Sequence, residues 1–331
     1  MRPTIADIAK EAGLTPGTVS RALSAPGKYY VSTETRERAA KAASKLGYRP
    51  NFVGKALAAG ASGLICLLAN HPFSSYYTNV ARQLAHHSAR DGYCLVTDCA
   101  LDNQDGVEQV PRQEWLYGVD GIIACDPAHW HQEYLEEAHR LRIPMVHLGT
   151  AVDESADSVV VDLYEPSRIL IRHLMEQGCE SIAFVTDDSP HKTESRARAY
   201  RLEMERVNRP VLYIEAAHHS RSCGREAILR HQGSPFDAVF CANDEMAIGA
   251  YRALIELGRS VPQDVAVAGC DGIEDAAYQH TPITTLTQPL DEMCAATWDF
   301  LKQRMGGSTE PPQIFRTSAK LEIRASTLRR V

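Results

Sequence analysis

The chain has 331 residues and a formal net charge of −7, and hydrophobic and aromatic residues make up 44% and 7% of it. This length exceeds that of one small core and indicates two or three domains. No stretch approaches the roughly 20 apolar residues of a membrane span, and residues 1–20 lack the apolar core of a secretory signal. Nine scattered cysteines without a CxxC pair argue against a disulfide framework. We therefore expect a globular cytoplasmic protein.

The first segment, residues 4–23, predicts two short helices joined by a tight corner. Thr4 is a candidate cap for a helix with apolar residues at i, i+3, i+4 and i+7, and Gly13 supplies its end. Thr15 followed by Pro16 is the pattern of a new helix start. The second helix turns the following residues outward, as the recognition helix of a helix-turn-helix requires: Pro16, Gly17, Thr18, Ser20 and Arg21.

Charge divides the chain into two parts. Residues 1–62 hold ten lysines and arginines against four acidic residues, a net charge of +6, whereas residues 63–331 carry −13. A basic end on an acidic body suits a protein that presents that end to a polyanion. A third helix is expected from Ser32 to a stop at Gly47. The sequence therefore predicts a helical head that binds DNA.

From Leu64 onward, short apolar runs alternate with helix-length amphipathic segments. Runs such as LICLLA, VDGIIA, SIAFVT and VAVAG are apolar throughout, which is typical of buried parallel strands. Helical patterns lie between them, for example at residues 79–91 and 244–257. We expect an α/β fold in which two doubly wound parallel-sheet subdomains, with a cleft between them, follow the all-α head.

In open α/β sheets, ligands bind beyond the carboxyl ends of the strands. Asp271 follows the run VAVAGC, Asn243 follows AVFCA, and Asp126 follows the run VDGIIAC. Carboxylates and guanidinium groups make paired hydrogen bonds to neighbouring hydroxyls, and an aromatic ring covers the apolar face of a sugar. These residues predict a polar ligand-binding cleft at the carboxyl ends of the strands.

The segments together resemble the LacI/GalR family of transcription regulators. The matching stretches are IADIAKEAGLTPGTVSRAL and VSTETRERAAKAASKLGYRPN, followed in order by GCDG, ITTLTQP and LEIRAST, so the resemblance spans essentially the full chain. It implies a periplasmic-binding-protein-like body whose chain crosses between subdomains near Val161 and near Gln288. The expected domains are a helix-turn-helix domain (1–47), a hinge helix and linker (48–62), an N-terminal effector-binding subdomain (63–160 plus 290–317) and a C-terminal one (161–289 plus 318–331).

The resemblance also implies effector-binding residues. Arg196, in TESRARAYRLEM, matches the family's effector-binding arginine, and Arg198 is the alternative if the register is shifted. Asp271 and Asn243 match two further effector-binding residues. For the remaining candidates, a role in a loop or at the subdomain interface is as good an interpretation as ligand contact: His71, Phe73, Ser74, Tyr76, Asp126 and His219.

In the family, the segment after the head is a hinge that becomes helical on DNA and inserts a leucine into the minor groove. Leu57 matches that leucine, whereas Gly54 and Lys55 replace the usual Ala-Arg. The residues expected to contact DNA are Thr4, Thr15, Pro16, Gly17, Thr18, Ser20, Arg21, Asn51, Lys55 and Leu57.

The sequence thus predicts a repressor that binds a near-palindromic operator as a homodimer and responds to a small molecule, a sugar or sugar derivative. No enzyme, cofactor or metal site is expected, because no GxSxG, P-loop or GxGxxG motif follows a strand and the paired histidines lack metal-ligand spacing. The C-terminal residues lack the apolar heptads of a tetramerising coiled coil, which favours a dimer. The alternative is a solute-binding module, and the effector acts either as inducer or as corepressor.

Overall fold

The computed structural model describes residues 3–24, 30–48, 61–69, 74–98, 118–127, 132–187 and 195–329. The chain divides into two compact units, Met1–Ser62 and Gly63–Val331, and each is described by itself. The predicted site residues His71, Phe73, Asn51, Lys55 and Leu57 lie outside the described residues.

The first unit has the helices α1 (Ile5–Ala12), α2 (Pro16–Ala22) and α3 (Thr33–Lys45) among its described residues. Thr4 caps α1 in a capping box, in which its backbone N–H donates to the Asp7 carboxylate at 2.8 Å. Gly13 ends α1 with φ 61°. Thr15 caps α2 by accepting from the Thr18 N–H at 3.2 Å. The predicted starts of both helices and the end of α1 are confirmed.

Side chains of α3 complete the ends of the two shorter helices. Arg38 Nη2 donates to the Ala12 carbonyl at 2.7 Å, and Arg36 Nη1 donates to the Ala22 carbonyl at 3.0 Å. Carbonyls in the last turn of a helix have no partner within it, so these arginines stabilise the head. Its small core contains Ile8, Ala9, Val19, Ala42 and Ala43. Two of the basic residues that give the head its charge thus have an internal role.

The second unit contains two sheets, each six-stranded within the described residues. The first sheet has the order β11 (Ile314–Ser318), β5 (Asp157–Asp162), β4 (Met145–Gly149), β3 (Gly121–Cys125), β1 (Leu64–Ala69) and β2 (Cys94–Asp98). The second has the order β12 (Lys320–Glu322), β10 (Thr284–Thr287), β9 (Ala266–Asp271), β8 (Ala238–Cys241), β6 (Ile182–Thr186) and β7 (Leu212–Glu215). Described neighbours pair in parallel except β10 with β12, which is antiparallel. The predicted α/β fold class is therefore confirmed.

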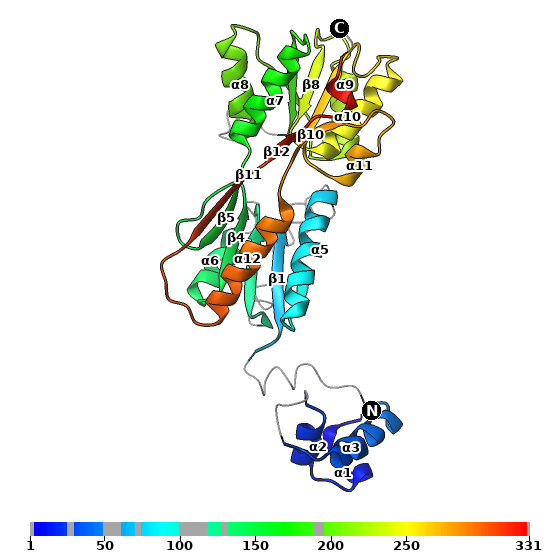
Figure 1. Cartoon of the computed structure of the whole chain (residues 1–331), viewed down its shortest axis with the longest axis vertical. Coiled ribbons are helices and arrows are strands. Elements are labelled where there is room, and N and C mark those ends of the chain that lie inside the picture. The colour runs from blue at the N-terminus through cyan, green and yellow to red at the C-terminus, as the bar shows by residue number, and fades with distance from the viewer. Residues whose placement is uncertain are drawn as a thin grey trace. The chain divides into compact units, whose positions relative to one another are not determined.

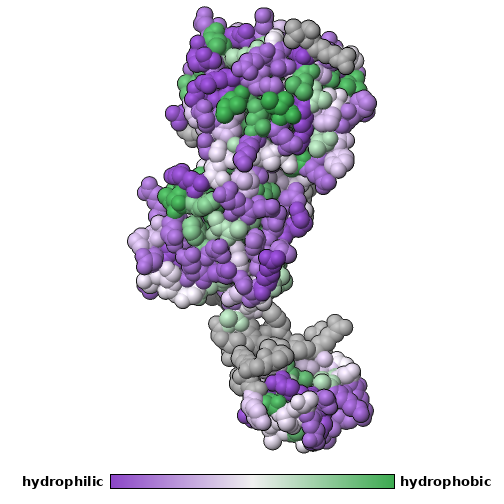
Figure 2. Space-filling view, viewed as in Figure 1, coloured by the Kyte–Doolittle hydropathy of each residue, from purple (hydrophilic) through white to green (hydrophobic). Residues whose placement is uncertain are grey.

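Helices cover both sheets. The first sheet with α5 (Ser75–Arg90), α6 (Gln132–Arg140) and α12 (Leu290–Met305) forms the first subdomain, and α5 and α12 run side by side along it (Figure 1). The second sheet forms the second subdomain with α7 (Tyr164–Glu176), α8 (Ser195–Arg206), α9 (Arg221–Arg230), α10 (Asp244–Glu256), α11 (Glu274–Ala277) and the 3₁₀ turn η3 (Ala325–Thr327). No described helix is long and apolar enough to cross a membrane. The face of this unit in Figure 2 is largely hydrophilic, with its largest group of hydrophobic residues on the second subdomain.

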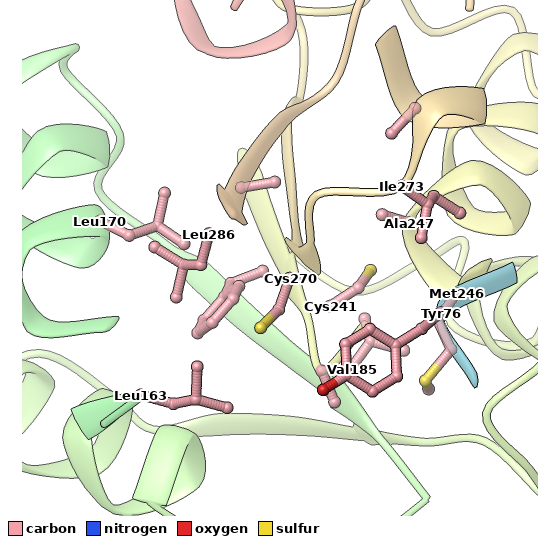
Figure 3. Packing of buried hydrophobic residues seen from close by; sticks show 14 of the residues in the cluster. Tyr76, Leu163, Leu170, Val185, Cys241, Met246, Ala247, Cys270, Ile273 and Leu286 are labelled. Carbon is pink, nitrogen blue, oxygen red and sulfur yellow. The ribbon is translucent and has the colours of Figure 1, made fainter. Parts of the chain in front are cut away.

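The chain passes between the subdomains three times within the described residues. It crosses after β5, again after β10, and a third time between β11 and β12. One apolar cluster joins the two halves, because Tyr76 of α5 and Leu163 before α7 belong to the same cluster as the core of the second subdomain. Figure 3 shows Tyr76, Val185 and Met246 among the residues of this cluster. The carboxyl ends of both sheets therefore meet across a packed junction.

A buried carboxylate ties α8 to α7 in the second subdomain. Glu203 of α8 is 1% exposed and accepts hydrogen bonds from Arg168 at 2.7 Å, Arg172 at 2.8 Å and Arg206 at 2.8 Å. Burial by itself raises the pKa of Glu203, but the hydrogen bonds from the three arginines outweigh it and lower the pKa to about 2. The charged form of Glu203 therefore stabilises the folded state.

Acid is expected to remove this stabilisation. The carboxyl titrates near 4.5 when unfolded and near 2 when folded, so about 3 kcal/mol of stability present above pH 4.5 is lost as the pH falls toward 2. Glu203→Gln should lower the free energy of unfolding at pH 7 by about 2–3 kcal/mol, measured by urea denaturation at pH 7 and pH 3. Glu205→Gln, at a half-exposed pair with Arg201, is the control and should change it by less than about 1 kcal/mol. Equal losses in both variants would contradict this account.

Candidate functional site

A cavity of about 160 Å³ lies where the carboxyl ends of the two sheets meet. It is smaller than the roughly 300–1,000 Å³ pockets of drug-sized ligands, which favours a small ligand. Its lining comes from both subdomains and is mostly polar: Ser74, Tyr76, Tyr77, Asp126, Thr150, Leu163, Arg196, His219, Asn243, Asp271 and Gln288.

The first subdomain supplies Asp126, directly after β3. Its Oδ1 accepts from the Thr150 N–H at 3.0 Å, and its backbone has φ 41°, in the left-handed region. A Cβ at Gly149 would come within 2.0 Å of Asp126 Oδ1, so glycine at the end of β4 makes room for the carboxylate. Burial raises the pKa of Asp126, while hydrogen bonds from Thr150 and the charge of Arg196 oppose the increase.

The second subdomain supplies Asp271, the last residue of β9. Its backbone has φ 116°, a strained conformation for a residue with a side chain, and such strain is concentrated at functional sites. Gln288 Nε2 donates to Asp271 Oδ1 at 2.9 Å, and the Tyr76 hydroxyl donates to Gln288 Oε1 at 3.0 Å. Burial and the nearby charge of Asp244 raise the pKa of Asp271 well above its usual value. A chain of hydrogen bonds thus crosses the cavity from α5 to β9.

Arg196, in the first turn of α8, is the arginine of the cavity. Its Nη1 donates to the carbonyl of Ala242 just after β8, and its positive charge lowers the pKa of both Asp126 and Asp271. Arg198 is exposed and lies over the ring of Tyr164, 5.4 Å from its centroid, instead of lining the cavity. The structure therefore places Arg196, and not the alternative Arg198, in the cavity that the two carboxylates line.

Asn243 and His219 complete the wall formed by the second subdomain. Asn243 caps α10 by accepting from the Met246 N–H at 2.8 Å, and its Nδ2 donates to the His219 carbonyl at 3.3 Å. The His219 ring lies 2.7 Å from the Asp187 carboxylate, measured from Nε2 to Oδ1. The Asn243 amide is thus fixed in orientation at the cavity.

Seven of the nine predicted ligand residues line this one cavity: Ser74, Tyr76, Asp126, Arg196, His219, Asn243 and Asp271. The prediction missed Tyr77, Thr150, Leu163 and Gln288. Thr150 follows a strand run and one glycine, so the strand-end rule could have found it. No group of three metal-ligating side chains occurs among the described residues.

The head presents a second candidate surface on α2. Thr15, Pro16, Gly17, Ser20 and Arg21 are exposed and Thr18 is partly buried. Thr18 Oγ1 lies 2.9 Å from Thr15 Oγ1, and Arg21 Nε donates to the Gly17 carbonyl at 3.2 Å, which lays the guanidinium along the helix. Thr4 is exposed too, but its hydroxyl donates to Asp7 Oδ2 at 2.7 Å as part of the cap. The exposed side chains of this segment thus extend from Thr15, the cap of α2, to Arg21 in its last turn.

Comparisons with known proteins match both units. Residues 4–51 match the model of bacterial regulatory proteins of the lacI family, and residues 171–327 match that of the periplasmic binding protein-like domain. The ribose operon repressor of Halalkalibacterium halodurans is 28% identical over 98% of this chain and 97% of that protein. Catabolite control protein A of Priestia megaterium is 26% identical over 99% of this chain and 100% of that protein. The fold is similar to the lac repressor dimer bound to operator and an anti-inducer, with a TM-score of 0.78 and 24% identity over 99% of this chain and 100% of that one.

Proposed function

Since the chain belongs to the LacI family of bacterial regulatory proteins, we propose that it is a sequence-specific transcriptional repressor whose affinity for operator DNA is controlled by a small molecule. One observation carries the proposal: a helix-turn-helix head with an exposed second helix shares its chain with a two-sheet unit whose charged cavity holds Arg196 and Asp271. An enzyme is not supported, because the curated relatives are named as repressors and a control protein.

Two heads of a homodimer would bind the halves of a near-palindromic operator, each with α2 in the major groove. The net charge of +6 on residues 1–62 suits binding to the phosphate backbone. We propose that Asn51, Lys55 and Leu57 form the hinge that enters the central minor groove. Because it acts on DNA, the protein would work in the cytoplasm.

The ligand we propose is a sugar or sugar derivative. Asp126, Arg196, Asn243 and Asp271 offer fixed hydrogen-bond donors and acceptors to neighbouring hydroxyls, and Tyr76 and Tyr77 offer aromatic surface. A relative named for the ribose operon agrees with this class. Ligand in the cavity would shift the relative orientation of the subdomains, and a coupling of about 1–3 kcal/mol would change operator affinity roughly 5- to 150-fold.

Two measurements test the proposal. Selection from a pool of randomised DNA duplexes should yield a near-palindrome for the full chain, whereas residues 63–331 alone should bind ligand but not that DNA. Ligand is sought by thermal shift with monosaccharides, disaccharides, sugar acids, phosphates and purines. A chain that selects no sequence but binds a sugar would instead be a solute-binding module.

Gly17 allows a test of how closely DNA approaches α2. A Cβ at this exposed helical position meets no atom within 4 Å, so the fold does not require glycine there. Gly17→Ala should therefore raise the thermal stability of the head by up to about 1 kcal/mol. It should also weaken binding to the selected operator by about 1–2 kcal/mol, since the added methyl group faces the groove. Thermal denaturation and fluorescence anisotropy measure the two effects, and an unchanged operator affinity would place DNA away from Gly17.

A further inference from the structure

Three consecutive residues at the start of α5 contact both the cavity and the second subdomain. Ser74 caps α5 and lines the cavity, and Tyr76 lines it and donates to Gln288 at 3.0 Å. Between them, the Ser75 N–H donates to Glu245 Oε1 at 3.2 Å, and Glu245 belongs to α10 of the second subdomain. The first turn of a helix has backbone N–H groups without partners in the helix. Here the opposite subdomain supplies the acceptor.

Arg221 of α9 completes this contact. Its guanidinium is ion-paired with the Glu245 carboxylate and with Asp275 at 3.1 Å, and its Nη2 donates to the Ser75 hydroxyl at 3.4 Å. The negative charge of Glu245 also lies at the positive end of the α5 dipole, which is favourable. Ser75, Arg221, Glu245 and Asp275 together are called the clasp below. It links α5 of the first subdomain to α9, α10 and the start of α11 of the second.

Close packing of α9 against α10 fixes the clasp residues of the second subdomain. A Cβ at Gly249 would come within 1.9 Å of the Arg221 carbonyl oxygen, and one at Gly224 within 2.4 Å of the Met246 carbonyl oxygen. The helices α9 and α10 thus pack backbone to backbone at the point where Arg221 and Glu245 leave them. The position of the Glu245 carboxylate is therefore fixed relative to the second sheet, and so is the turn of α5 that it holds.

Glu245 of the clasp is ionised at neutral pH. Burial by itself raises the pKa of Glu245, but hydrogen bonds from Arg221 and Ser75 lower it below its usual value. Facing charges come from α9 through Arg221 and from α11 through Asp275. Because the folded-state pKa is depressed, the contact persists above the ordinary carboxyl range and weakens only in acid.

We propose that Glu245 and Arg221 are positioning residues for the ligand cavity: they hold the first turn of α5 against the second subdomain and so set the orientation of the two subdomains. Regulation through this orientation rests on the function proposed above. Neither residue lines the cavity. A ligand that contacts Ser74 or Tyr76 would act on the same turn of α5. The clasp would therefore couple ligand binding to the subdomain movement that changes operator affinity.

Hydrogen exchange of the full chain without ligand or DNA tests the clasp directly. Glu245→Ala should speed exchange in the first turn of α5 about tenfold, as expected for loss of a hydrogen bond to a charged group. Arg221→Ala should also speed this exchange. It should disturb the fold less than Glu245→Ala, because the Arg221 side chain is 45% exposed. The matched control is Arg225→Ala. Arg225 is also on α9, 42% exposed and paired with Glu256 of α10, but this pair lies within the second subdomain.

The second measurement is operator affinity without effector, on DNA selected with the wild-type chain. Arg221→Ala should change it at least about fivefold and Arg225→Ala should not. If the first turn of α5 exchanges at the wild-type rate in both Arg221→Ala and Glu245→Ala, the proposed positioning role of the clasp is wrong. Faster exchange with unchanged operator affinity overturns its regulatory role. If the wild-type chain selects no DNA, the proposed function fails, while the exchange result still decides whether the clasp exists.

Discussion

Arg196→Ala is expected to abolish the response to ligand while operator binding in its absence stays unchanged. Arg196 lines the same cavity as carboxylates from the two subdomains, and its positive charge acts on the pKa of both. Its guanidinium would donate to ligand hydroxyls, and truncating such a partly buried charged donor costs about 2 kcal/mol, or roughly thirtyfold in Kd. The variant also removes the charge that lowers the pKa of Asp126 and Asp271, so both carboxyls shift further toward their protonated form.

The measurement is calorimetric titration with a ligand found by the thermal-shift screen, together with operator affinity with and without that ligand. Arg198→Ala is the matched control, because it removes an equal charge two residues along α8 from an exposed site over Tyr164. The control should respond like the wild type. A normal response in Arg196→Ala would move the ligand site out of this cavity.

Local rules predicted much of the head and of the cavity. Caps at Thr4 and Thr15 and the stop at Gly13 depend on neighbouring residues alone, so the sequence reveals them. Asp126, Asn243 and Asp271 were identified because the carboxyl ends of parallel strands meet at one edge. Each of these predictions needed only the order of residues along the chain.

The features that the sequence did not reveal depend on distant partners. Ser75 and Glu245 are 170 residues apart, and nothing near either one indicates that a helix start would meet a carboxylate across the subdomain junction. Gln288 was identified only as a crossover, although its amide joins Tyr76 to Asp271. Arg36 was counted only in the charge of residues 1–62, whereas it donates to the Ala22 and Ser24 carbonyls around the end of α2. Side-chain partners of this kind follow from packing, which residue patterns do not encode.

Arg21→Ala is expected to weaken binding to the selected operator by about 1–3 kcal/mol, or roughly 5- to 150-fold. Arg21 is exposed in the last turn of α2, and its bond to the Gly17 carbonyl directs the guanidinium toward the start of the helix. Pro16 and Gly17 offer no side-chain hydrogen-bond donor there, so Arg21 is the cation best placed to bind DNA from this helix.

A base contact and a phosphate contact by Arg21 give different results when operator binding is titrated. If Arg21 binds a base, the variant should lose its preference at one operator position; if it binds a phosphate, affinity should fall equally for all sequences and the salt slope should decrease by about one. Lys45→Ala is the control, because it removes one positive charge from the same unit at a site already paired with Glu11 at 2.7 Å. Long-range attraction falls by the same charge in both variants, so only a direct contact makes Arg21→Ala weaker than Lys45→Ala. Equal affinities and equal salt slopes for the two variants would remove Arg21 from the DNA interface.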